Sequence, residues 1–74
     1  MKKTYYKITY SYNAGLLATD HVENTNEGAI EFEENYKNQF PDCDKCYTTR
    51  KITVTKVFGI RVKIESEIIR SWCE

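Results

Sequence analysis

Glycine and proline are scarce in this chain of 74 residues, which contains three glycines and one proline. Their scarcity excludes collagen-like and low-complexity structure. Long apolar runs are also missing, since the longest span only two or three positions, as in Leu16-Leu17-Ala18. We therefore expect neither a membrane-spanning helix nor the apolar segment of a signal peptide, and we predict a cytoplasmic protein.

Cysteine occurs only three times, and this odd count does not fit the even disulfide framework of small secreted domains. Cys43 and Cys46 have the Cys-x-x-Cys spacing that can bind zinc, and Cys73 with the single histidine, His21, would complete a set of four ligands. Both additional ligands are remote in sequence. We therefore predict free thiols and no bound metal or cofactor, with a small zinc-stabilised adaptor as an alternative.

Catalytic motifs are missing as well. The chain contains no P-loop, GxGxxG, HExxH or GxSxG sequence. His21 has no serine or cysteine at a spacing that indicates a nucleophile and its general base. The length allows one domain, residues 1–74, and leaves no room for a two-domain enzyme. We predict that the protein is not an enzyme.

Net charge is zero, but the charges are segregated along the chain. Residues 20–44 carry eight acids and one lysine, whereas residues 45–63 carry six bases and no acid. Such segregation predicts one acidic element and one basic element on a dipolar molecule.

Two pairs of strands are predicted by alternating apolar and polar residues, rich in β-branched and aromatic side chains. The first pair spans residues 4–12 and 16–23, with a short turn over 13–15. The second pair spans residues 47–57 and 60–64. Phe58-Gly59 forms the turn between them, with glycine where a positive φ is required.

A helix is predicted between the two pairs, over Glu27–Phe40. Asn24 or Thr25 can cap its first amides, and Pro41 ends it. Its apolar stripe comprises Ala29, Phe32, Tyr36 and Phe40. Residues 66–74, which include Trp72, fit either a short C-terminal helix or an extension of the last strand.

These elements predict an α+β fold, in which one helix packs on one face of a four-stranded, mostly antiparallel sheet in β-β-α-β-β order, with the short C-terminal helix as an optional addition. The expected core lies between helix and sheet. It comprises Tyr6, Ile8, Tyr10, Leu16, Ala18, Val22, Ala29, Phe32, Tyr36, Phe40, Ile52, Val54, Ile60, Val62 and Ile64.

Two charged surfaces are candidate binding sites on this fold. The first is an acidic helix face of Glu27, Glu31 and Glu34, which can meet a basic surface of a partner. The second is a basic sheet face opposite the helix, which mixes lysine and arginine with one aromatic residue and can contact nucleic acid. Its members are Tyr5, Lys7, Lys51, Arg61 and Lys63.

The function that these features favour is protein binding without catalysis, by covering a surface of a larger protein or complex. Trp72, outside the expected core, is a candidate anchor residue. As a very short, single-domain α+β chain without a catalytic motif, the protein is similar to small inhibitors encoded by phages and mobile elements, such as anti-CRISPR proteins. This analogy rests on size class only. The alternative function is nucleic-acid binding through the basic sheet face, which the neutral net charge weakens.

Overall fold

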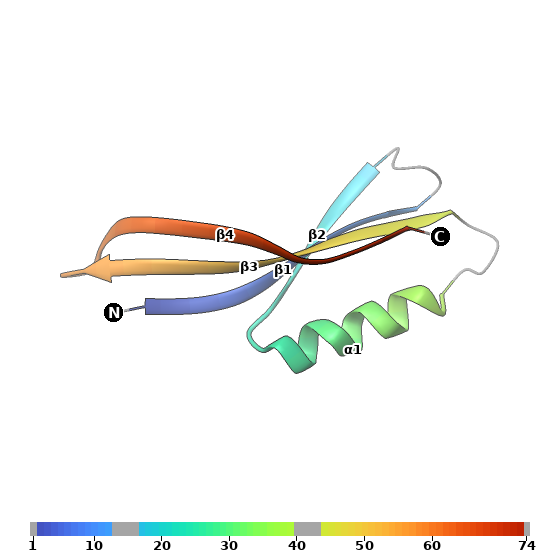
Figure 1. Cartoon of the computed structure of the whole chain (residues 1–74), viewed down its shortest axis with the longest axis horizontal. Helices are drawn as coiled ribbons and strands as arrows, with labels where there is room; N and C mark the ends of the chain where they lie inside the picture. The colour runs from blue at the N-terminus through green and yellow to red at the C-terminus, as the bar shows by residue number, and fades with distance from the viewer. Residues whose placement is uncertain (1, 13–16, 40–43, 74) are drawn as a thin grey trace.

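Four strands form one antiparallel sheet, and one helix lies against one of its faces (Figure 1). The computed structural model describes residues 2–12, 17–39 and 44–73, with the side chains of Leu17, Arg61 and Val62 left undescribed. In chain order the elements are β1 (Lys2–Tyr12), β2 (Leu17–Glu23), α1 (Asn26–Lys37), β3 (Lys45–Val57) and β4 (Ile60–Cys73). In the sheet the strand order is β2-β1-β3-β4. The predicted α+β class, with four antiparallel strands and one helix, is confirmed.

Both ends of α1 are capped by side chains. The Gly28 amide donates a hydrogen bond to Thr25 Oγ1 at 3.0 Å. Thr25, one of the two candidates that the sequence offered, is therefore the N-cap. At the other end Lys45 Nζ donates to the carbonyls of Lys37 and Gln39, at 2.6 and 2.7 Å. These bonds satisfy carbonyls that lack helical partners. The helix ends at Lys37, before the predicted end at Phe40.

Strand register decides which side chains face the helix. Tyr10 pairs with Tyr47 and Ile8 with Thr49, and cross-strand partners lie on the same face of a sheet. The buried core therefore combines Ile8 with Ala29, Tyr36 and Tyr47. Aromatic rings surround it, because Tyr6, Tyr10, Tyr12, Phe32 and Trp72 pack against it while remaining partly exposed.

Part of the predicted core lies elsewhere. Ile52 and Val54 are buried, at 8% and 7% exposure, but Ile52 pairs with Tyr5 and so lies on the face opposite the helix. Several other expected core residues are exposed, namely Ala18, Val22, Ile60 and Ile64. Strand parity explains most of these errors, since β3 turns its odd-numbered residues toward the helix, while Ala18, Val22 and Ile64 pair with residues of the opposite face. Ile60 pairs with Val57 and lies on the helix side, but beyond the end of the sheet that the helix covers (Figure 1). The predicted turn at 13–15, and also Leu16, Phe40, Pro41 and Cys43, lie outside the described residues.

The helix covers only one end of the sheet, and the other end projects beyond it (Figure 1). We call this projection the β-arm. It comprises residues 2–5 of β1, 51–57 of β3, 60–67 of β4 and the turn at residues 58–59. The molecule is correspondingly elongated, with dimensions of 49 × 24 × 16 Å.

The β-arm ends in the predicted two-residue turn. Val57 pairs with Ile60, while Phe58 and Gly59 have φ values of 54° and 79°. Positive φ at both central residues is the pattern of the type I′ turn, which matches the twist of the strands that it joins. Glycine adopts this conformation freely, whereas phenylalanine does so at a conformational cost.

The C-terminal segment is strand rather than helix, since β4 continues to Cys73. Cys46 and Cys73 lie directly opposite each other on β3 and β4 and form a disulfide. The prediction of free thiols is therefore wrong for these two residues. Among the described residues, no helix has the length and apolar character needed to span a membrane.

Candidate interaction surfaces

The acidic helix face is present as expected. Glu27, Glu31 and Glu34 are all exposed on the side of α1 that faces away from the sheet, and exposed Ile30 lies beside them. Glu34 also forms an ion pair with Lys37, at 3.6 Å between Oε1 and Nζ. This helix face thus presents Glu27 and Glu31 beside the Glu34–Lys37 ion pair, with one apolar side chain at its border.

The predicted basic sheet face does not form as one surface. Lys51 pairs with Tyr6 and Lys63 pairs with Thr55, which places both lysines on the helix side of the sheet. Tyr5 and Lys7 lie on the opposite face. Arg61 belongs to β4, but its side chain is outside the described part. The same parity of β3 that displaced Ile52 and Val54 divides this set.

A different basic surface exists on the helix-free side of the sheet, which we call the open face. Its charged residues with described side chains are Lys3, Lys7, Arg50, Lys56 and Asp20, Tyr5 lies among them, and its large aliphatic residues are Val22, Ile52, Val54, Ile64 and Ile68. A hollow in its β-arm section is lined by Lys3, Tyr5, Val54, Lys56 and Ile64. Basic groups thus surround an apolar strip.

Asp20 is the acidic residue of the open face among the positions described. Its Oδ2 lies 3.4 Å from Lys7 Nζ, and its Oδ1 accepts a hydrogen bond from the Thr9 hydroxyl at 2.8 Å. The Thr9 bond and, after it, Lys7 lower the pKa of Asp20. The carboxylate is therefore ionised at neutral pH and neutralises part of the charge of Lys7.

The tip of the β-arm is apolar. Phe58 is 98% exposed, and its neighbours Val57 and Ile60 are exposed too. The side chain of Phe58 makes almost no packing contact, and the two-residue turn imposes positive φ on this residue although it has a Cβ atom. The sequence pattern predicts the turn but gives no signal for a role of Phe58.

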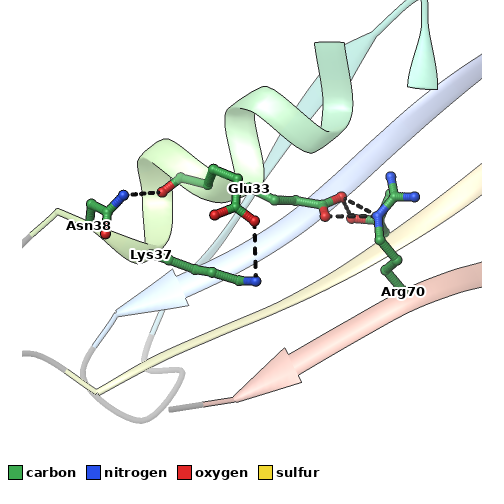
Figure 2. A network of polar contacts seen from close by, with 6 residues as sticks. Glu33, Lys37, Asn38 and Arg70 are labelled. Atoms are coloured by element: carbon green, nitrogen blue, oxygen red, sulfur yellow. Dashed lines mark hydrogen bonds and ion pairs between the residues drawn. The ribbon is translucent and has the colours of Figure 1, made fainter. Parts of the chain in front are cut away.

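A buried polar network joins α1 to the sheet. Glu33 is 2% exposed, and its carboxylate accepts hydrogen bonds from Thr49 Oγ1 at 2.7 Å and from Arg70 Nε at 2.8 and 2.9 Å (Figure 2). Sequence reasoning missed this network, although Glu33 lies at the border of the apolar stripe of the helix. These partners bind both carboxylate oxygens of Glu33 and join the helix to β3 and β4, which favours a structural role over a reactive one.

The alternative zinc site is not assembled. Cys46 and Cys73 share a disulfide and so cannot serve as thiolate ligands, and Cys43 is outside the described residues. His21 lies on the helix side of the sheet, not on its open side, because it pairs with Ile8. Its ring stacks on Phe32, 4.0 Å between centroids, and Nε2 contacts the Glu23 carboxylate. Within residues 2–12, 17–39 and 44–73, no cluster of three metal-binding side chains occurs.

Trp72 is partly buried rather than free. Its ring stacks on Tyr47 with centroids 5.7 Å apart, and Lys37 Nζ lies 5.4 Å from its centre. These contacts place Trp72 at the margin of the core. The exposed aromatic residue best placed to act as an anchor is therefore Phe58.

Comparisons of this chain with family models, with curated proteins and with solved structures found no match.

Proposed function

We propose that this protein is a non-enzymatic binding module that covers a surface of a larger protein with the open face and tip of its β-arm. The observation that carries this proposal is the concentration of exposed apolar side chains in the β-arm. Phe58, Ile60 and Ile64 retain 98%, 68% and 55% of their accessible surface, and Ile68 continues the apolar strip of the open face just beyond the β-arm. Contiguous exposed apolar surface is typical of protein-binding sites.

The charges around this surface indicate what kind of partner fits it. Lys3, Lys7, Arg50 and Lys56 flank the apolar strip, so a complementary partner has an apolar patch bordered by carboxylates. Burial of Phe58 and the isoleucines supplies most of the affinity, while the lysines and arginine speed the encounter. The acidic helix face lies on the other side of the molecule. The opposite charges on the two sides would orient the protein in the electrostatic field of its partner.

Small inhibitors commonly act by covering a surface, a mode that needs no catalytic group. The size-class analogy with phage-encoded inhibitors of the anti-CRISPR kind is consistent with this mode of action. The inhibitor hypothesis thus remains part of the proposal, and its target is a protein that the open face can cover.

Nucleic-acid binding is the second candidate, and one observation favours it. Tyr5 lies on the open face among four basic residues, an arrangement that can contact phosphates and stack one base. The remaining large side chains of this face are isoleucine and valine, which offer no aromatic surface to further bases. Protein binding therefore accounts for more of the open face.

Site-specific photo-crosslinking tests the proposal. A photoreactive phenylalanine analogue at position 58 should form protein adducts in cells that produce the chain naturally, and these adducts should resist nuclease. The same analogue at Ile30, exposed on the helix, is the matched control and should form fewer adducts. Adducts that disappear on nuclease treatment would support the nucleic-acid alternative. Equal labelling from both positions would overturn the assignment of the β-arm.

A second experiment measures the rates of association and dissociation separately, once the adduct identifies a partner. Phe58→Ser should speed dissociation, because it removes the largest exposed apolar side chain. Lys3→Glu together with Lys56→Glu should slow association at low salt. Glu31→Lys with Glu34→Lys tests the acidic helix face in the same assay. A rate of association insensitive to salt and to all four charge reversals would contradict the electrostatic part of the proposal.

A further inference from the structure

β4 forms one edge of the sheet, and its outer side is unpaired within the described residues. Figure 1 shows this strand along the border of the β-arm, away from the helix. An unpaired edge presents free amide and carbonyl groups, and proteins usually protect it with proline, bulges or inward-pointing charge. β4 has bulges or irregularities opposite Thr49/Arg50 and Thr55/Lys56, and between them residues 63–68 form a regular edge without proline.

The side chains of this regular segment alternate between charged residues on one face of the sheet and uncharged residues on the other. Lys63, Glu65 and Glu67 point to the helix side of the sheet, whereas Ile64, Ser66 and Ile68 belong to the open face. Lys63 and Glu65 form an ion pair of 3.1 Å within the strand, but their side chains are 66% and 58% exposed. Both charges can therefore exchange this contact for one across an interface.

We propose that two copies of this protein pair antiparallel through their β4 strands. The two-fold axis of this dimer lies midway between the two Ile64 residues. In this arrangement Ile64 of one copy lies opposite Ile64 of the second copy. Lys63 of each copy lies opposite Glu65 of the other, so the interface contains this charge pair twice. Opposite charges directly across an antiparallel pair are stabilising, and like charges are destabilising.

Charge complementarity selects this register from its neighbours. A two-fold axis perpendicular to the sheet keeps every side chain on its own face. Directly opposed residues must share a face, so the axis must relate a residue to its own copy and cannot relate it to the copy of its neighbour. An axis at Glu65 would oppose Glu65 to itself, and an axis at Ser66 would oppose Glu65 to Glu67. An axis at Lys63 would oppose two lysines. An axis at Glu65 would also oppose Lys63 to Glu67, but the axis at Ile64 opposes Lys63 to Glu65 without any like-charge pair and joins two exposed apolar side chains.

The pairing would unite the two sheets into one, with both helices on the same side. It would also place the two open faces next to each other as a continuous apolar and basic surface. The dimer does not depend on the proposed partner, because oligomeric state is measured on the purified protein alone. Its failure would therefore leave the photo-crosslinking result unaffected.

The test is the molar mass of the purified chain, measured by sedimentation equilibrium over a range of concentrations. We expect a concentration-dependent dimer. Lys63→Glu and Glu65→Lys should each weaken association by roughly tenfold, since each creates two like-charge oppositions. The exchange of both charges in one chain, Lys63→Glu with Glu65→Lys, should restore the dimer, because each new glutamate again faces a lysine.

Two further variants complete the test. Ile64→Lys should abolish the dimer by placing two ammonium groups at the axis. Lys2→Glu, an exposed change in the β-arm but on β1, is the control and should leave the mass unchanged. Circular dichroism of each variant checks that it remains folded. A monomer at every concentration, or a dimer that the charge exchange fails to restore, would overturn the proposal.

Discussion

The half of the sheet beneath α1 and the β-arm are built from similar strands but differ in what their side chains contact. Under the helix, Ile8, Tyr36 and Tyr47 are buried, Glu33 and Arg70 are paired, and a disulfide joins β3 to β4. Among the elements that the structure describes, none covers either face of the sheet in the β-arm, and Ile64 and Phe58 remain exposed. The difference indicates that the covered half holds the fold together, while the β-arm presents a surface.

The largest effect is expected where the covered half buries charge. Arg70→Met leaves the Glu33 carboxylate buried without its cationic partner, and we expect a loss of about 3–5 kcal/mol in the free energy of unfolding. The double variant Glu33→Leu with Arg70→Met removes both charges and should be far less destabilised. Urea denaturation measures both. A single variant within about 1 kcal/mol of wild type would show that the buried pair contributes little.

A smaller loss is expected from the hydroxyl of Tyr36. This hydroxyl shares its one proton between the carbonyls of Ser11 and Cys46 and accepts a hydrogen bond from the Cys46 amide at 3.1 Å, so it links α1 to β1 and β3. Tyr36→Phe leaves these backbone groups unpaired, and we expect a loss of about 1–3 kcal/mol. Tyr5→Phe, on the open face, is the matched control and should change stability by less than about 0.5 kcal/mol.

The Tyr36 contribution should also depend on pH. Burial raises the pKa of Tyr36 above its ordinary value of about 10, despite the backbone hydrogen bonds. A raised pKa in the folded state means that the stabilisation is complete below the unfolded-state pKa and is lost as pH rises through the folded value. Wild type should therefore lose more stability than Tyr36→Phe between neutral pH and the alkaline range. Equal slopes for the two proteins would refute this assignment.

The smallest effect, and one of opposite sign, is expected at the tip of the β-arm. Phe58→Asn places a residue that tolerates positive φ in the type I′ turn and should stabilise the protein by roughly 0.5–1 kcal/mol. Phe58→Ala retains the conformational cost and should bring no such gain. Thermal unfolding compares the two variants. A stabilised Asn variant that binds partner less well would sharpen the division between a stabilising half and a binding arm.

Local elements were well predicted, because short-range chemistry specifies them. Alternation identified the four strands, the hydroxyl of Thr25 capped the helix, and Phe58-Gly59 formed the turn. Failures began where one strand met another. The apolar character of Ile52 and Val54 suggested the helix side, but their burial occurs on the open face.

The candidate sites divide in the same way. Glu27, Glu31 and Glu34 share an exposed helix face because helical periodicity alone places them together. The basic surface required knowledge of register, since a shift of one residue moves a whole strand to the other face. Lys51 and Lys63 therefore lie on the helix side of the sheet. The basic residues beside Tyr5 and Lys7 on the open face are instead Lys3, Arg50 and Lys56.

The sequence by itself determined the number and type of elements, the cap, the hairpin turn and the segregation of charge, all of which follow from residues within a few positions of one another. Tertiary structure alone decided that Cys46 meets Cys73, that Glu33 meets Arg70, and that the helix leaves the β-arm uncovered. The first two outcomes bring together residues 27 and 37 positions apart in the chain, and the third depends on where the helix packs on the sheet. Local periodicity allows either parity for a strand, and only packing against the helix and its neighbouring strands selects one.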